Sequence, residues 1–69
     1  MKINYDKIAD AMYIRLKKGD VKKTIKMKDR LLVDVDKNGN VLGMELLNAS
    51  TQIPKKQINT VELGMIASA

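Results

Sequence analysis

The sequence contains no cysteine, histidine, tryptophan or phenylalanine, and it has a single proline. Without cysteine, disulfide scaffolds and thiolate zinc sites are excluded. Without histidine, the chain also lacks the commonest general base and metal ligand. Most enzyme mechanisms therefore lose their central residue, and we expect a protein that is not an enzyme, with no catalytic residue, metal or cofactor.

Long hydrophobic runs are also missing. No apolar stretch approaches the roughly 18 residues that a membrane span needs. The first residues contain no apolar segment of signal-peptide length. These absences predict a cytoplasmic protein that makes no contact with a membrane.

What is present is the composition of one small globular domain, residues 1–69, with 45% hydrophobic and 30% charged residues. Its core must consist of aliphatic side chains, because Tyr5 and Tyr13 are the only aromatic residues. A chain this short buries only about 60% of the surface that its unfolded form exposes. Since no disulfide can stabilise such a core, we expect the chain to form a homo-oligomer, most simply a dimer.

Alternation of apolar and polar residues runs through much of the sequence and predicts β-strands. It occurs in the first residues, in residues 11–17 and, less regularly, in residues 21–27. Asp6 is typical of a residue that caps a short helical turn, here over residues 7–10. Lys23 falls on the apolar side of the third strand, so it must extend to the sheet margin or mark a β-bulge.

The strongest local signal is a β-hairpin between residues 31 and 47. Asn38-Gly39 is the dipeptide favoured in a two-residue type I′ turn, because both residues tolerate positive φ. The predicted register places Lys37 opposite Asn40, Val35 opposite Leu42, Val33 opposite Met44 and Leu31 opposite Leu46. A shift by one residue would bury Asp34, Asp36 and Glu45, at a prohibitive cost.

The loop before this hairpin must hold an odd number of residues if the apolar faces are to match. Lys28-Asp29-Arg30 satisfies this requirement when Arg30 adopts the left-handed conformation. Met27 would then pair with Leu31, and Ile25 with Val33.

Residues 51–69 form a C-terminal extension. Pro54 suits the first position of a short helix over residues 55–59. Residues 60–65 alternate again, with Val61, Leu63 and Met65 on one side, and predict a last strand. The predicted fold class is therefore mostly β (α+β), a small antiparallel β-meander of four to six strands with one short C-terminal helix and one apolar face.

Several short motifs recur in a familiar order: Tyr5-Asp6, Ala9-Asp10-Ala11, Tyr13-Ile14, Val33-Asp34-Val35-Asp36 with Gly39, and Gly43-Met44-Glu45-Leu46-Leu47-Asn48-Ala49-Ser50. Residues 1–50 thereby resemble a widespread family of small prokaryotic proteins with the domain of unknown function 2283. The resemblance implies a compact, mostly β domain with no established activity. The third strand is rich in lysine here, whereas it is often acidic in the family, and Arg30 stands where glycine is common. A role for the basic strand therefore does not follow from the family.

The spacing of a calcium-binding loop is present in Asp34, Asp36, Asn38, Gly39 and Glu45. That loop coils between two helices, whereas here its ligand positions fall within strands, so the hairpin excludes it. The hairpin instead places Asp34, Asp36 and Glu45 on its outer face, where a divalent cation could bind weakly. The favoured interpretation is an acidic row paired across the sheet with Lys22 and Lys26.

Positive charge is the second functional signal, since the net charge is +5. Candidate anion contacts on the basic strand are Lys22, Lys26, Lys28 and Arg30. A basic stripe attracts phosphate backbones, so a nucleic-acid-binding accessory protein is one alternative function. Against it stand the lack of Phe or Trp for stacking, and the use of lysine to protect exposed strand edges.

Tyr5, Asp6, Asp10 and Tyr13 cluster around the first turn. A carboxylate and a phenol could share a proton there, but nothing in the sequence places a nucleophile nearby. The favoured interpretation is structural: Asp6 caps the turn, Asp10 fixes the entry of the next strand, and the tyrosine hydroxyls reach water or a carboxylate.

The apolar face is the remaining candidate site, because one sheet with a single apolar face cannot enclose itself. Its candidate interface residues are Met12, Ile14, Leu16, Val33, Val35, Met44, Val61 and Leu63. We therefore predict a self-associating, non-enzymatic module for protein interaction or assembly, with another protein as a further partner. The alternatives are the nucleic-acid-binding protein and a weakly cation-binding hairpin.

Overall fold

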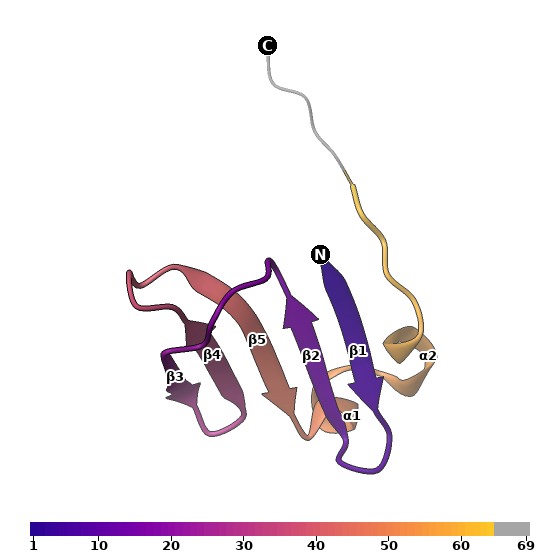
Figure 1. Cartoon of the computed structure of the whole chain (residues 1–69). Helices are drawn as coiled ribbons and strands as arrows, with labels where there is room; N and C mark the ends of the chain where they lie inside the picture. Colours follow the sequence, from indigo (N-terminus) through magenta and orange to yellow (C-terminus); the bar gives the residue numbers. More distant parts are fainter. Residues whose placement is uncertain (65–69) are drawn as a thin grey trace.

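The computed structural model describes residues 1–64, which form one five-stranded antiparallel sheet and two short helices (Figure 1). The elements are β1 (Lys2–Asp6), β2 (Ala11–Arg15), β3 (Lys23–Lys28), β4 (Leu31–Val35), β5 (Val41–Leu47), α1 (Ala49–Gln52) and α2 (Lys55–Ile58). The predicted mostly β fold is confirmed, and α1 is a helix that the sequence patterns did not indicate. The predicted last strand is wrong for residues 60–64, which form none, and Met65 lies outside the described residues.

The strands lie in the order β1-β2-β5-β4-β3, so β5 occupies the centre of the sheet. The connection between β2 and β3 crosses the ends of β5 and β4 to reach the far edge (Figure 1). The sequence of each strand fits its place. The central strand β5 contains one charged residue, Glu45, whereas the edge strand β3 carries Lys23, Lys26 and Lys28. Lysines on an edge strand discourage pairing with further chains.

The hairpin of β4 and β5 has the predicted register over most of its length, with Leu31 opposite Leu46 and Val33 opposite Met44. The loop differs from the prediction. Val35 pairs with Val41, so Leu42 is an extra residue in a bulge. Between Asp36 and Asn40, Gly39 is the residue with a positive φ, of 81°. This is the geometry of a longer turn followed by a left-handed glycine.

Asp36 explains why the longer loop replaces a type I′ turn. Its Oδ1 accepts hydrogen bonds from the backbone N–H groups of Asn38 and Asn40, both at 2.9 Å. The Gly39 N–H donates to the Asp36 carbonyl at 3.1 Å. Aspartate at the first position of a turn commonly caps it in this way, and here it outweighs the preference of Asn38-Gly39.

The turn between β3 and β4 contains a second correction. Ile25 pairs with Val33 as predicted, but Lys28, not Met27, pairs with Leu31. Met27 is the extra residue of a β-bulge. The prediction matched the apolar faces of the two strands by an odd number of loop residues, whereas the structure matches them by this bulge. The left-handed conformation predicted for Arg30 is also wrong, because Asp10 and Asn48 are the non-glycine residues with positive φ within residues 1–64.

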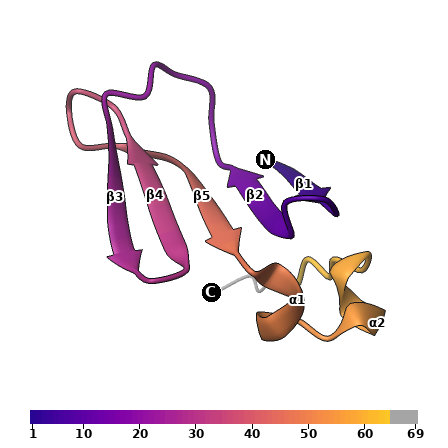
Figure 2. The ribbon, with the colours of Figure 1, turned by 90° about the horizontal axis from the view of Figure 1, so that it is seen from below.

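The buried core is small, and both helices lie beside the sheet near β1 and β2 (Figure 2). Its buried apolar residues are Ala11, Met12, Val35, Leu42 and Ala49. Ala49 opens α1 directly after β5 and is 0% exposed. No helix within residues 1–64 has the length and apolar content needed to cross a bilayer.

Candidate functional site

Asp10 connects the first turn of the sheet to the helices. Its Oδ1 accepts hydrogen bonds from the Tyr5 hydroxyl at 2.6 Å and from the Ser50 backbone N–H at 3.0 Å. Its Oδ2 accepts the Ser50 hydroxyl at 2.7 Å, and its carbonyl accepts the Ala49 N–H at 2.9 Å. These bonds hold α1 against the turn between β1 and β2.

The hydrogen bonds of this cluster favour the ionised form of the Asp10 side chain. The hydrogen bond to Asp10 raises the pKa of the Tyr5 phenol. The bonds from Tyr5 and then from Ser50 lower the pKa of the Asp10 carboxyl. A carboxylate with a lowered pKa is a weak base, so this arrangement favours positioning of α1 over activation of Ser50.

The predicted structural interpretation of the first turn is confirmed. Asp6 Oδ1 caps the turn by accepting the N–H groups of Ile8 at 2.9 Å and Ala9 at 3.1 Å. Beside this turn lies an open groove of 510 Å³. Its lining residues are Tyr5, Lys7, Asp10, Ser50, Lys55, Ile58 and Asn59.

On the opposite, outer face, Tyr13 reaches across the central strand to Asp34. Its hydroxyl donates to Asp34 Oδ2 at 2.8 Å, and Thr24 donates to Asp34 Oδ1 at 2.6 Å. The phenol passes over Gly43, where an added Cβ would lie 2.5 Å from the Tyr13 hydroxyl oxygen. The bond to Asp34 raises the pKa of Tyr13. Sequence patterns missed this pair, although a glycine inside a strand signals a close approach.

The outer acidic residues do not form one cluster in the described residues 1–64. Asp34 accepts hydrogen bonds from Tyr13 and Thr24, whereas the sequence predicted that the acidic row pairs with Lys22 and Lys26. Asp36 is used inside the hairpin loop, where its bonds to the Asn40 backbone and side chain hold its pKa low. Among residues 1–64, no group of three or more Asp, Glu, His or Cys side chains is placed to hold a metal ion.

The four predicted anion contacts are divided between two parts of the molecule. Lys22 leads into β3, and Lys26 lies opposite Leu32 on the outer face. Lys28 and Arg30 lie at the turn between β3 and β4, where they line a separate groove of 390 Å³ with Leu31 and Leu46. The structure instead brings other cations together, because Arg15, Lys17 and Lys18 line one hollow with Tyr13.

The predicted interface residues also differ in exposure. Met12 and Val35 are buried, and Ile14, Val33 and Met44 are half-buried. Leu16, Val61 and Leu63 are exposed, at 42%, 62% and 73%. The strand registers align one row of apolar side chains across all five strands: Ile3, Ile14, Met44, Val33 and Ile25. Every member of this apolar row is only half-buried.

Comparison with known proteins identifies the family of the chain. Residues 2–50 match the family described as protein of unknown function (DUF2283). The chain belongs to this family. It is also 42% identical over 50 residues to the uncharacterized protein MJ0789 of Methanocaldococcus jannaschii. That match covers 72% of this chain and 42% of the relative, so the chain spans less than half of the relative's length. No solved structure matches the chain.

The DUF2283 resemblance predicted from the sequence is thus confirmed, and the structure gives its motifs a physical meaning. Tyr5, Asp10 and Ser50, from the first and last motifs, form the hydrogen-bonded cluster at α1. Tyr13 and Asp34 form the pair across β5. In this DUF2283 domain the motif residues therefore join distant elements of the fold.

Proposed function

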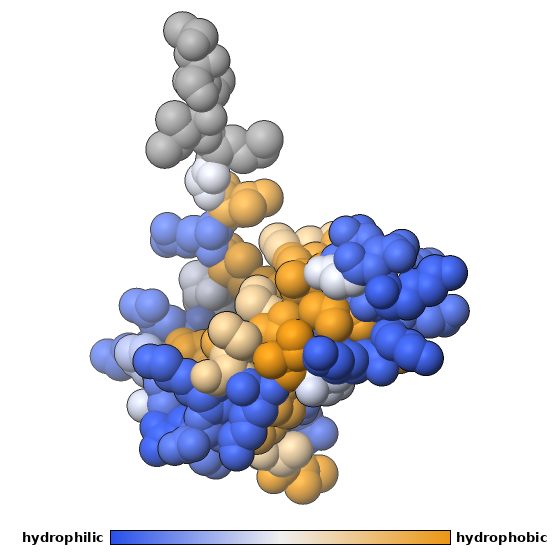
Figure 3. Space-filling model, turned by 90° about the vertical axis from the view of Figure 1, so that its left-hand side faces the viewer, coloured by the Kyte–Doolittle hydropathy of each residue, from blue (hydrophilic) through white to orange (hydrophobic). Residues whose placement is uncertain are grey.

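We propose that this DUF2283 domain is a non-enzymatic module that self-associates through the apolar face of its sheet. The apolar row carries this proposal, because its five side chains cross the whole sheet from β1 to β3 and are all only half-buried. The helices lie near β1 and β2 (Figure 2), and all five side chains of the row stay partly exposed. Figure 3 shows the result as an apolar band between hydrophilic regions.

A second copy of the chain is the occupant that fits this band. Within residues 1–64, the core has five buried apolar residues and no large side chain that is fully buried, so this part of a single copy gains little from burial. Fully burying one aliphatic side chain contributes about 1.5–3 kcal/mol. Two copies placed face to face would bury both apolar rows, in a two-fold contact of the kind that most small oligomers use.

The non-enzymatic part of the proposal is supported by the chemistry of the two hydrogen-bonded clusters. Asp10 and Asp34 are the carboxylates best placed to act as bases, and each already accepts hydrogen bonds from two side chains. The sequence has no histidine or cysteine to replace them. The proposal also includes a second protein as a binding partner of this module.

Multi-angle light scattering on the full chain tests self-association. We expect a dimer at micromolar concentration and a melting temperature that rises with protein concentration, because the partner stabilises the fold by mass action. Ile25→Lys places a charge at the edge of the apolar row and should yield a folded monomer. Asn4→Lys makes the same charge change on the exposed outer face of β1 and should leave the dimer intact.

The circular dichroism spectrum separates loss of association from loss of folding in the Ile25→Lys variant. If that variant does not fold, the concentration dependence of wild-type melting still decides the question. A well-folded wild-type monomer with a melting temperature independent of concentration would refute the proposal.

A further inference from the structure

The outer face of the sheet presents an aromatic side chain that lies across the central strand. Tyr13 is fixed at its hydroxyl by the 2.8 Å bond to Asp34, and its ring passes over Gly43, which has no side chain. The hydroxyl end of the ring lies over Gly43, so the aromatic surface of Tyr13 belongs to the outer face of the sheet. Tyr13 is half-buried, so part of this surface is accessible.

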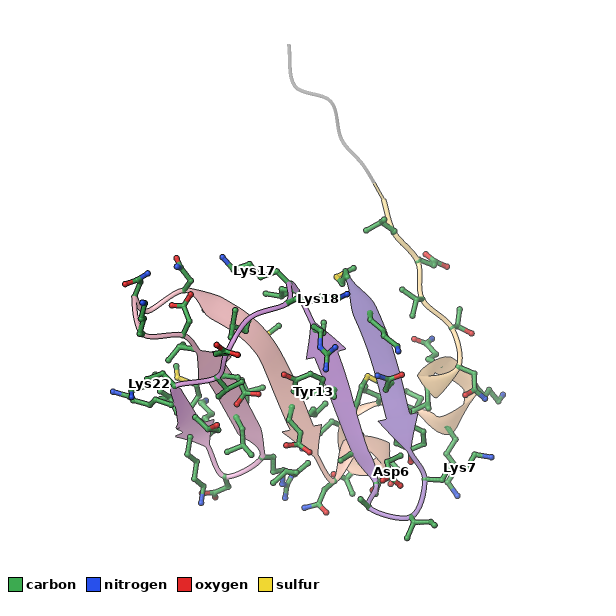
Figure 4. The ribbon with its side chains drawn as sticks, in the orientation of Figure 1. Asp6, Lys7, Tyr13, Lys17, Lys18 and Lys22 are labelled. Atoms are coloured by element: carbon green, nitrogen blue, oxygen red, sulfur yellow. The ribbon has the colours of Figure 1, made fainter. Side chains whose placement is uncertain are left out.

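Cations border this ring on the side of the connection between β2 and β3. Arg15, Lys17 and Lys18 line a hollow of 170 Å³ together with Tyr13, a volume sufficient for a phosphate group. Figure 4 shows Lys17, Lys18 and Lys22 along the connection, on the same side of the molecule as Tyr13. All four cations are exposed.

Negative charge occupies the centre of the same face. Asp34 is bonded to Tyr13, and Glu45 lies directly opposite Tyr13 on β5. An acidic peptide would bring carboxylates close to these two groups. A nucleic acid can place its phosphates on the basic rim while a neutral base enters the centre, where carboxylates accept hydrogen bonds from base amino groups.

We propose that the outer face binds single-stranded nucleic acid, with a base stacked on Tyr13 and the adjacent phosphates held by Arg15, Lys17 and Lys18. Single strands fit better than duplexes, because only unpaired bases can stack on an aromatic side chain of a sheet surface. This site lies on the opposite face from the apolar row, so it is independent of self-association.

Fluorescence anisotropy with labelled single-stranded RNA and DNA 12-mers tests the site on the full chain. We expect binding at 50 mM salt and an affinity roughly twentyfold lower at 200 mM, as about three phosphate contacts predict. Comparison of the RNA and DNA arms shows which sugar is preferred. A labelled duplex of the same sequence should bind more weakly than either single strand.

Two pairs of variants locate the contact. Replacing both Lys17 and Lys18 by Gln should lower the affinity about tenfold and flatten the salt dependence. The matched control replaces Lys55 and Lys56 of α2 by Gln, which removes the same charge on the helix side of the sheet and should leave the affinity within about twofold.

Tyr13→Leu removes the ring and should lower the affinity at least fivefold, whereas Tyr13→Phe keeps the ring and should bind nearly as the wild type does. If Tyr13→Leu does not fold, tyrosine emission reports stacking directly. In Tyr5→Phe, Tyr13 is the single remaining tyrosine, and its emission should fall when a single strand binds.

Three results would each overturn the proposal. The first is an anisotropy that does not change at 50 mM salt. The second is an equal loss of affinity in the variants of Lys17 and Lys18 and in those of Lys55 and Lys56, which would show attraction by net charge alone. The third is binding of the duplex at least as tight as that of the single strands.

Discussion

Tyr13 and Asp34 are linked across β5 by a 2.8 Å hydrogen bond, although 21 positions separate them in the sequence. β2 and β4 flank the central strand, so neither residue could reach the other if a side chain stood between them. Gly43 leaves this path open. The bond therefore ties together the two halves of the sheet, and its dependence on one glycine makes it testable.

Gly43→Ala should destabilise the fold by about 1–3 kcal/mol, because overpacking forces neighbouring groups to move. The new Cβ would lie 2.5 Å from the Tyr13 hydroxyl oxygen and 2.9 Å from the Ile14 carbonyl oxygen. Urea unfolding followed by circular dichroism measures the change. Gly64→Ala is the control and should be neutral, since among residues 1–64 no atom beyond its chain neighbours lies within 4 Å of its added Cβ.

The two tyrosines should titrate at higher pH in the folded protein than in the denatured protein, because hydrogen bonds to Asp10 and Asp34 raise both pKa values. A raised pKa contributes stability that is fully present below about pH 10 and is lost as the pH rises through the folded value. Phenolate absorbance measures this titration directly, since the chain has no tryptophan. Coincident folded and denatured curves would contradict the two hydrogen bonds.

Asp10→Asn should lower the melting temperature at pH 7 and reduce the loss of stability in acid. The lowered pKa of Asp10 contributes stability that is present above about pH 3.9 and is lost as the pH falls through the folded value. Asparagine tolerates the φ of 51° at this position, so the backbone is retained. Thermal melts from pH 7 to pH 2 measure the effect, and Asp20→Asn in the exposed β2–β3 connection should retain the wild-type profile.

Leu42→Ala should cost about 2–4 kcal/mol, because it removes a side chain that is 3% exposed and leaves a cavity beside the connection. Val41, its neighbour in the same bulge, is 41% exposed. Val41→Ala should therefore cost less than about 1 kcal/mol. Chemical denaturation of both variants checks the bulge, and equal losses would contradict the exposures of Leu42 and Val41 in the observed bulge.

The alternation of residues was sufficient to predict the strands and most of the hairpin register. Burial of Asp34 or Glu45 would cost so much that a one-residue shift is excluded, and the register with Leu31 opposite Leu46 is observed. The family motifs could also be identified from the sequence. Residue alternation is a local pattern, and the motifs occur in a fixed order along the chain, so neither requires knowledge of the tertiary structure.

The details that the sequence patterns missed depend on competition between local signals. In the β4–β5 loop, Asp36 bonds to two backbone N–H groups and outweighs the preference of Asn38-Gly39 for a shorter turn. Met27 leaves the ladder in a bulge, so the parity of the preceding turn is satisfied in the strand. A three-residue loop and a bulge at Met27 both keep the apolar side chains on one face. The periodicity of the sequence therefore does not distinguish the two.

The sequence by itself determined the class of the protein, a small β domain with one apolar face, because residue types fix which side chains avoid water. Only the tertiary structure decided which residues meet. It placed β5 beside β2, brought Ser50 to Asp10, and separated Lys28 from Lys22 while gathering Lys17 and Lys18 near Tyr13. These contacts depend on the order of strands in the sheet, which no local pattern encodes.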